Sequence, residues 1–408
     1  MTIVFADYIL TCDENFTLIE KGAICFEKTI IDIDTQEAFL GKYPDATIIH
    51  TDPHTVLMPG LINPHVHLEF SANQSTLTYG DFMPWLGSVI QYREELLEAA
   101  KGDIISRAIE EMVHSGTTTF GAISSFGMDL EACVKSPART IFFNEILGSR
   151  PDAVDILFED FRHRLHCAED ARSSRFIPAI SIHSPYSTHP ILARNALDMA
   201  RKEKYVVSTH FMESQAERNW LDNAEGDFAD FFAGFAPGAR PFCTPLEYLD
   251  LFYGCSTLFT HTVQATQNER EIIAKMQGTI THCPRSNRLL GTGLMDLQAT
   301  IASGINLTLG TDGLSSNTSL SLWEELRVAL MSHSDIPLQS LAQTLLYSVT
   351  RNGAKALRLN TGELSRGKEA DIIALTLKEA PKSLAQLPLH LILQASTPNH
   401  IFIEGDRI

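Results

Sequence analysis

The sequence lacks the features of proteins that bind nucleic acids or membranes. Basic residues are scarce, since 32 Lys and Arg stand against 50 Asp and Glu, for a formal net charge of −18. An acidic surface repels phosphate backbones, so we expect no nucleic-acid partner. No stretch reaches the ~18 uninterrupted apolar residues of a membrane span, and Asp7 interrupts the first apolar run, which has no basic segment before it. We therefore expect no membrane partner and no signal peptide.

Paired cysteines are also lacking. The seven cysteines are scattered along the chain, and no two have Cys-x-x-Cys spacing. This usage is typical of reduced, mostly buried thiols in a cytoplasmic protein. Hydrophobic residues make up 44% and charged residues 20% of the 408 residues, as in ordinary globular proteins. This length accommodates one large domain and a smaller one.

The middle of the sequence, from about residue 57 to residue 360, alternates short β-type runs with helical patterns. Eight runs, most of them rich in Val, Ile, Thr and Phe, have the nearly continuous apolarity of strands buried on both faces. They are Val56–His67, Thr117–Ser124, Thr140–Gly148, Phe176–Pro185, Tyr205–Phe211, Ser256–Val263, Thr279–Pro284 and Ile305–Asp312. Helical spacing of apolar residues marks Glu94–Ser115, His189–Lys204 and Leu338–Leu359. The alternation predicts an α/β protein with a closed (β/α)8 TIM-like barrel, and an open doubly wound sheet is the main alternative.

The two ends of the chain have a different pattern of short strands and turns. The predicted strands are Thr2–Leu10, Gly22–Phe26, Thr29–Ile33, Ala370–Leu377 and His400–Glu404. Neither end can bury its strands alone, so we expect both ends to pair into one small β-sandwich domain. The predicted domains are residues 1–57 with residues 361–408 for the small β-domain, and residues 58–360 for the barrel.

Polar residues end several of the predicted barrel strands, where active sites of such barrels lie. His65 and His67 are two residues apart in one strand, so both can face the barrel axis. The fifth, sixth and eighth strands end at His210, His261 and Asp312. Each residue alone is typical of a buried polar group held by a hydrogen bond, but all fall at one edge of the barrel. Imidazoles and a carboxylate together suit Zn²⁺ or a similar first-row ion.

Four further residues are interpreted from their positions in the sequence. Glu213 follows His210 by one short turn and can reach a water on such an ion, and a solvated loop glutamate is the alternative. Glu217 is expected to face solvent. Trp85 and its neighbour Phe82 can stack on a base, and simple burial explains them equally well.

Together these segments resemble the amidohydrolase superfamily, in its branch of nucleobase and nucleoside deaminases and chlorohydrolases. The matching segments are Met58–His67, His210–Glu213, His261, His282–Asn287, Gly310–Gly313 and Gly367–Ile372. The resemblance implies that one divalent metal ion per subunit is bound by His65, His67, His210 and Asp312. Zinc is the default and iron(II) is the alternative. No lysine ends the fourth strand, as it does in dinuclear relatives, so a single ion is expected.

The resemblance also implies a catalytic role for three residues. Glu213 matches the proton shuttle that takes a proton from the attacking water and delivers it to a ring nitrogen. His261 and Asp312 match the groups that hold the new oxygen while ammonia leaves. A non-catalytic member of the family should have lost metal ligands, and this chain keeps all of them.

Further segments indicate which substrate within this branch of the family the resemblance implies. Leu68–Ser71, Tyr79–Phe82, Trp85–Val89 and Ser286–Leu290 resemble the aminodeoxyfutalosine deaminases of the futalosine route to menaquinone. This implies hydrolytic deamination of an adenine nucleoside, 6-amino-6-deoxyfutalosine, to futalosine and ammonia. Methylthioadenosine, adenosylhomocysteine or adenosine deaminases are the alternative, although they commonly carry an acidic residue where this chain has Met83. Guanine deaminases or chlorohydrolases would keep the metal site and change the pocket.

The implied substrate carries an adenine, a ribose and a benzoate. The expected substrate contacts are Trp85, Glu145, His183, Glu213, Arg288 and Arg150. Glu145 and His183 are candidates for ribose and base. Arg288 is the first candidate for the benzoate and Arg150 the second, and either arginine is equally explained as part of a surface ion pair. The sequence leaves a homodimer open.

Overall fold

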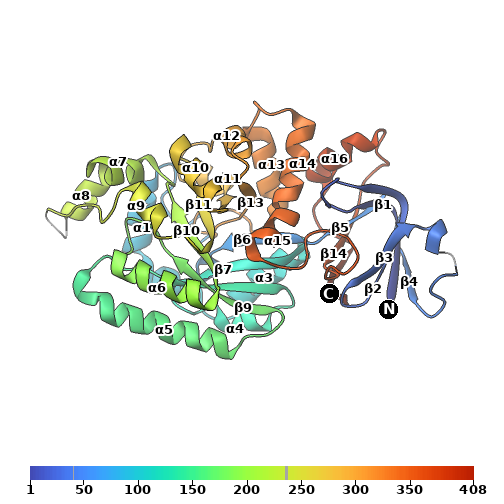
Figure 1. Cartoon of the computed structure of the whole chain (residues 1–408), viewed down its shortest axis with the longest axis horizontal. Helices are drawn as coiled ribbons and strands as arrows, with labels where there is room; N and C mark the ends of the chain where they lie inside the picture. Colours follow the sequence, from blue (N-terminus) through green and yellow to red (C-terminus); the bar gives the residue numbers. More distant parts are fainter. Residues whose placement is uncertain (40, 235–237) are drawn as a thin grey trace.

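A computed structural model describes residues 1–39, 41–234 and 238–408 of the chain. Its strands form two sheets, one from the middle of the sequence and one from both ends (Figure 1). The predicted fold class, a (β/α)8 barrel with a separate β structure built from the termini, is confirmed. None of the described helices combines the length and the apolarity needed to cross a membrane.

The barrel contains eight parallel strands that follow one another in sequence order. They are β6 (Leu61–Val66), β7 (Thr117–Ser124), β8 (Arg139–Ile146), β9 (Phe176–Ile182), β10 (Val206–Phe211), β11 (Ser256–His261), β12 (Thr279–His282) and β13 (Asn306–Leu309). At the seam between β13 and β6, the Asp312 amide donates a hydrogen bond to the His65 carbonyl over 3.1 Å. The Asn63 side-chain amide donates to the Thr311 hydroxyl over 2.8 Å at the same seam. The seam thus joins two segments that carry predicted metal ligands.

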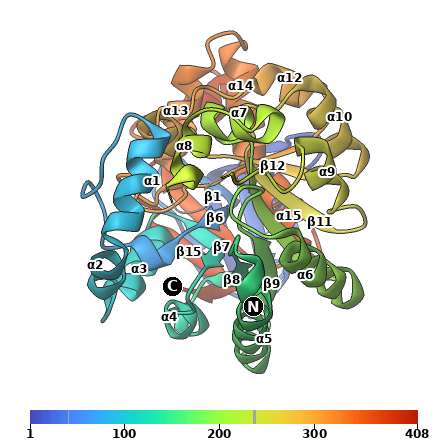
Figure 2. The ribbon, with the colours of Figure 1, turned by 90° about the vertical axis from the view of Figure 1, so that its left-hand side faces the viewer.

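Helices surround the barrel strands (Figure 2). Those that precede the sixth barrel strand are α1 (Phe82–Gln91), α2 (Arg93–Ala99), α3 (Ile104–His114), α4 (Leu130–Lys135), α5 (Val154–Asp170), α6 (Pro190–Glu203), α7 (Gln215–Asn223), α8 (Asp227–Ala233) and α9 (Pro245–Asp250). Those that follow it are α10 (Gln267–Lys275), α11 (Pro284–Leu289), α12 (Leu297–Ala302), α13 (Leu322–Ser332), α14 (Leu338–Ser348) and α15 (Arg351–Leu357). A last helix, α16 (Leu387–Gln394), packs against α13 and α14.

Three long predicted elements are each interrupted. The predicted strand Val56–His67 is two strands that belong to different sheets, and Gly60 lies between them. A glycine is needed at this turn, because a Cβ at position 60 would lie 2.2 Å from the Thr118 side chain. The predicted helix Glu94–Ser115 is divided between α2 and α3 near Gly102, which has a φ of +82°. Leu338–Leu359 is divided between α14 and α15 at Thr350, which lies outside the helical region at φ −132° and ψ −101°.

The second sheet is built from both ends of the chain. Its strands are β1 (Thr2–Leu10), β2 (Leu18–Phe26), β3 (Ile30–Thr35), β4 (Thr47–His50), β5 (Thr55–Pro59), β14 (Ile372–Thr376), β15 (His400–Ile403) and β16 (Asp406–Arg407). β5 pairs with β1 on one side and antiparallel with β14 on the other, so it joins the N-terminal strands to the C-terminal ones. We propose the predicted division into residues 1–57 with 361–408 and residues 58–360, and β5 spans the boundary.

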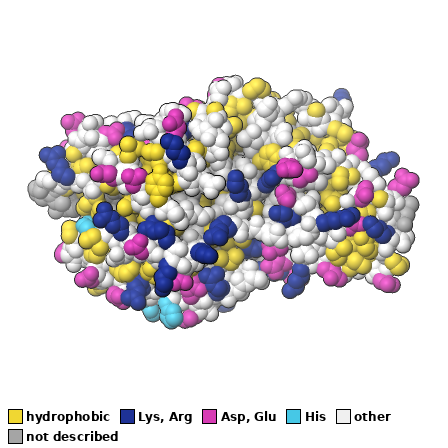
Figure 3. All heavy atoms as spheres, in the orientation of Figure 1, with side chains coloured by type: hydrophobic (Ala, Val, Ile, Leu, Met, Phe, Trp, Pro, Cys, Tyr) yellow, Lys and Arg dark blue, Asp and Glu magenta, His cyan; other side chains and the backbone are white. Residues whose placement is uncertain are grey.

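The molecular surface shows acidic and basic side chains interspersed with apolar ones over the face drawn in Figure 3. No large region of this face carries a single sign of charge. All seven cysteine thiols are free.

Candidate active site

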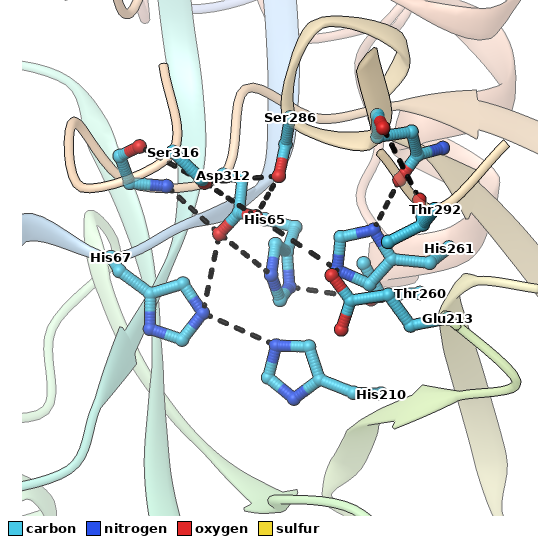
Figure 4. A network of polar contacts seen from close by, with 12 residues as sticks. His65, His67, His210, Glu213, Thr260, His261, Ser286, Thr292, Asp312 and Ser316 are labelled. Atoms are coloured by element: carbon cyan, nitrogen blue, oxygen red, sulfur yellow. Dashed lines mark hydrogen bonds and ion pairs between the residues drawn. The ribbon is translucent and has the colours of Figure 1, made fainter. Parts of the chain in front are cut away.

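The C-terminal edge of the barrel brings the four predicted metal ligands together (Figure 4). His65 lies on β6 with His67 directly after it, His210 lies on β10, and Asp312 follows β13. His67 Nε2 is 3.3 Å from His210 Nε2 and 3.6 Å from Asp312 Oδ1. His65 Nε2 is 3.8 Å from the same Asp312 oxygen. These side chains converge on one point.

The donor set at this point fits a divalent metal ion. His65 Nε2 is buried and has no hydrogen-bond partner among the described residues. Such a nitrogen is costly to bury unless it binds a ligand. His210 Nδ1 lies 2.7 Å from the His183 carbonyl oxygen, which orients His210 Nε2 toward the cluster as in metal-ligating histidines. Three imidazoles and one carboxylate are the ligands of a zinc-type site.

Burial sets the charge state of these ligands. It lowers the pKa of His65 well below its ordinary value and that of His210 to about 3, and neighbouring imidazoles lower both further. Burial also raises the pKa of Asp312, but His67, His261 and His65 outweigh it, so the pKa of Asp312 is lowered overall. His65 and His210 are therefore neutral and Asp312 is ionised at neutral pH, which are the states that bind a metal.

Glu213 faces the same space from the turn after β10. Its Oε1 is 3.5 Å from His261 Nε2. Burial, with smaller contributions from Asp312 and Glu217, raises the pKa of Glu213 well above its ordinary value. A buried carboxyl group whose pKa is raised holds a proton more readily than an exposed one, which suits it to general acid–base chemistry.

The expectation that Glu217 faces solvent is wrong. Its side chain is fully buried and accepts hydrogen bonds from the amides of Met212 over 3.0 Å and Glu213 over 2.8 Å. The Ser214 hydroxyl caps α7 by accepting from the Glu217 amide. The sequence contained this signal, because Ser-x-x-Glu is a capping pattern at the start of a helix. Glu217 thus fixes the turn that presents Glu213, and burial raises its own pKa to about 7.

His261 lies at the end of β11 and is held by a polar chain. Its Nδ1 is 2.9 Å from the Asn287 side-chain oxygen, and the Asn287 side-chain nitrogen is 3.4 Å from His282 Nδ1. The Asn287 oxygen can only accept, so His261 Nδ1 carries a proton. The neutral ring then directs an unprotonated Nε2 toward Glu213 and toward Asp312, whose Oδ2 is 3.9 Å away.

A cavity of about 360 Å³ opens beside the cluster. Aromatic side chains from α1, α8 and two loops form much of its wall, including those of Phe82, Trp85, Phe126 and Phe228. The Trp85 indole N–H donates to the Ser315 carbonyl over 3.0 Å, which fixes the ring against this wall. Sequence reasoning did not single out Phe126, which lies in a loop, or Phe228, which lies on α8, because neither residue ends a barrel strand.

Glu145 and His183 line this cavity together with Trp85 and Glu213. Glu145 is buried at the end of β8 and accepts from the Ser125 hydroxyl over 2.5 Å and the Ser181 hydroxyl over 3.3 Å. His183 follows β9, and burial lowers its pKa to about 3. Both groups are within the space expected to hold a ribose and a base.

The two arginines expected to meet a benzoate lie elsewhere. Arg288 is exposed on α11 and is not among the residues that line the cavity. Arg150 is also exposed and forms an ion pair with Asp152. Sequence reasoning missed Arg93, which does line the cavity.

Comparison with known proteins agrees with this geometry, since the model of the amidohydrolase family matches residues 56–408. The chain belongs to the amidohydrolase family. This amidohydrolase is 44% identical over 390 residues to an aminodeoxyfutalosine deaminase of Nitratiruptor sp., covering 96% of each chain. It is 33% identical over 411 residues to an adenosine deaminase of Helicobacter pylori, covering 100% of this chain and 99% of the relative.

A solved structure extends the comparison to the fold. The crystal structure of Helicobacter pylori aminofutalosine deaminase in complex with methylthio-coformycin superposes with a TM-score of 0.94 at 32% identity and covers 100% of both chains. The family resemblance inferred from the motifs is confirmed. This amidohydrolase is accordingly a hydrolase that acts on C–N bonds. Its family typically depends on a divalent metal, and the His and Asp cluster described above is a candidate site for one.

Proposed function

We propose that this amidohydrolase removes the adenine amino group of 6-amino-6-deoxyfutalosine by hydrolysis, giving futalosine and ammonia for menaquinone biosynthesis. The observation that carries the proposal is the 44% identity to an aminodeoxyfutalosine deaminase over 96% of both chains. The convergent ligand cluster and the aromatic cavity beside it support the same chemistry. The adenosine deaminase relative at 33% identity makes adenosine or methylthioadenosine the alternative substrate.

The proposed metal site is His65, His67, His210 and Asp312, with zinc as the default and iron(II) as the alternative. When bound, the ion supplies Lewis-acid activation, which lowers the pKa of water toward neutrality. Its presence is checked by elemental analysis of protein purified without added metal. About one ion per chain is expected, and a reproducible two ions per chain would contradict the site.

The chain's own residues move the protons. Addition of water to the amine-bearing carbon requires that the water lose a proton and that an adenine ring nitrogen gain one. Glu213, with its raised pKa, takes and delivers that proton. His261 faces the same space through Nε2, and Asp312 remains ionised to accept a hydrogen bond from the new oxygen. The neutral His183 and the buried Glu145 are placed to bind base and ribose.

The substrate assignment is tested by ammonia release from three nucleosides. Values of kcat/KM for 6-amino-6-deoxyfutalosine, adenosine and methylthioadenosine are compared on the same metal-replete preparation. We expect the first to exceed the other two by at least ~10-fold, as one added charge-assisted contact would give. Equal values would reject the assignment in favour of the adenosine or methylthioadenosine alternative.

We also propose a cellular location and an oligomeric state for this enzyme. Seven free thiols favour a reducing compartment, so we place the enzyme in the cytoplasm. A homodimer stays a prediction, which light scattering on the purified enzyme would check.

A further inference from the structure

The charged groups around the cavity are separated by sign. Its acidic residues are Glu145, Glu213 and Asp312, and all three come from the C-terminal edge of the barrel, near the predicted metal ligands. Among the described residues that line the cavity, Arg93 is the one Lys or Arg. A ligand carboxylate near the acids would be repelled. Arg93 is therefore the place in this cavity that favours a carboxylate.

Arg93 is the first residue of α2, directly after the helix that forms the apolar wall. Its guanidinium carbon lies 4.8 Å from the centroid of the Phe126 ring. Stacking on an aromatic face leaves the N–H donors at the edge of the guanidinium plane available. Within the described chain Arg93 has no acidic partner, whereas Arg150 is paired with Asp152. Arg93 thus combines a fixed ring contact with free donors.

The ring beneath Arg93 is itself held in place. Glu69 is buried and accepts hydrogen bonds from the amides of Ser125 over 2.8 Å, Phe126 over 3.1 Å and Met128 over 2.9 Å. Three backbone amides that donate to one buried carboxyl group fix the course of this loop. The loop therefore offers a rigid platform on which the guanidinium rests.

We propose that Arg93 is the residue that selects the substrate by its carboxylate. Its guanidinium binds the benzoate of 6-amino-6-deoxyfutalosine through paired hydrogen bonds, and the benzoate ring lies along the apolar wall that includes Trp85 and Phe82. The adenine end then reaches Glu213 at the deep end of the cavity. This inference rests on the proposed function, because adenosine and methylthioadenosine carry no carboxylate for Arg93 to bind.

The test compares Arg93→Met with Arg288→Met and Arg150→Met, the two exposed arginines outside the cavity lining. Each variant is assayed for kcat/KM on 6-amino-6-deoxyfutalosine and on adenosine. Arg93→Met is expected to lose ~10–150-fold on the carboxylate-bearing substrate, chiefly through KM, and to leave adenosine unchanged. Both control variants should match the wild type on both substrates. Arg93→Lys should recover part of the loss, because it restores the charge without the planar fork.

Binding of products separates recognition from chemistry. Calorimetry should show that Arg93→Met weakens futalosine binding by a similar factor and leaves inosine binding unchanged. Equal losses on both nucleosides, or a selective loss in a control variant and not in Arg93→Met, would overturn the assignment of Arg93. A wild-type enzyme without preference for the carboxylate-bearing substrate would reject the proposed function itself, and the role of Arg93 with it. A wild-type preference that survives Arg93→Met would reject only the role of Arg93.

Discussion

The two ends of the barrel both bury charged side chains, but they do so in opposite ways. At the N-terminal end, Arg139 begins β8 and is 1% exposed. Its guanidinium lies 2.6 Å from Asp371, 2.7 Å from Glu369 and 3.4 Å from Glu404. These carboxylates flank β14 and β15 of the terminal sheet, so the cluster ties that sheet to the barrel.

At the C-terminal end, like groups are crowded instead of paired. His67 and His210 approach to 3.3 Å, and the Nε2 of His65 has no hydrogen-bond partner among the residues that the structure describes. Glu213 adds a buried carboxyl whose pKa is raised by its surroundings. The difference shows which end is arranged for stability and which for ligand binding, because unsatisfied and perturbed groups cluster at functional sites.

The largest expected effect is at Glu213. Glu213→Gln keeps the shape of the side chain and removes its proton transfer, so kcat should fall by at least ~100-fold. The metal content, measured by elemental analysis, should stay at the wild-type level because Glu213 is not among the proposed ligands. The melting temperature should not fall, since an uncharged amide avoids the cost of burying a carboxylate. Near-normal turnover, or loss of the metal, would refute the role of Glu213 as proton shuttle. It would also weaken the distinction between a stabilising N-terminal end and a functional C-terminal end of the barrel.

Substitution of Arg139 should have the opposite effect to Glu213→Gln, lowering stability while leaving turnover nearly unchanged. Arg139→Met leaves Asp371 and Glu369 without their cationic partner, whereas Glu404 keeps its ion pair with Arg175. The free energy of unfolding should therefore fall by about 3–5 kcal/mol, as for other broken buried ion pairs. The kcat measured well below the melting temperature should be close to the wild-type value. Denaturant unfolding followed by circular dichroism measures the loss.

The matched control is Arg162→Met, which removes an exposed pair with Glu159 on α5. It should change stability little, because exposed pairs contribute little. If both arginine variants lose the same stability, the cluster at Arg139 is not the clamp described above. A fully stable but inactive Arg139→Met would place the N-terminal end in the chemistry and break the comparison.

The ligand cluster was predictable because its signal is local. Each residue ends a run of strand-like sequence, and parallel strands bring their ends to one edge, so His65 and Asp312 could be placed together from the sequence alone. The Arg139 cluster has no such signal. Arg139 and Asp371 are 232 residues apart, and only the docking of the terminal sheet brings them together.

The substrate-facing wall was the least predictable part of the site. Arg93 and Phe126 come from segments between strands, where the sequence pattern does not indicate which side chain faces the cavity. The apolar spacing over Glu94–Ser115 also predicted one continuous helix and gave no sign of the break at Gly102 that separates α2 from α3. Candidate arginines chosen by neighbouring motifs, such as Arg288, consequently lie outside the cavity.

The smallest expected effect concerns Asn287, which supports the C-terminal cluster without lying on the cavity wall. Asn287→Leu keeps the volume but leaves the Nδ1 proton of His261 buried without an acceptor. A lost buried partner is worth ~1–3 kcal/mol, so kcat should fall by ~5–150-fold. Asn287→Asp keeps an oxygen opposite His261 Nδ1 and should retain more activity than Asn287→Leu, which steady-state assays of both variants will show.

Asn287→Asp also tests whether turnover needs His261 in its neutral form. A carboxylate beside His261 favours the imidazolium form and so raises the pKa of His261. If turnover needs neutral His261 with a free Nε2, the acidic limb of the pH–kcat profile must move to higher pH in Asn287→Asp. An unmoved limb, or one that moves to lower pH, would show that the acidic limb does not report the protonation of His261. Turnover would then not depend on a neutral His261 with a free Nε2, and Asn287 would serve only to orient the ring.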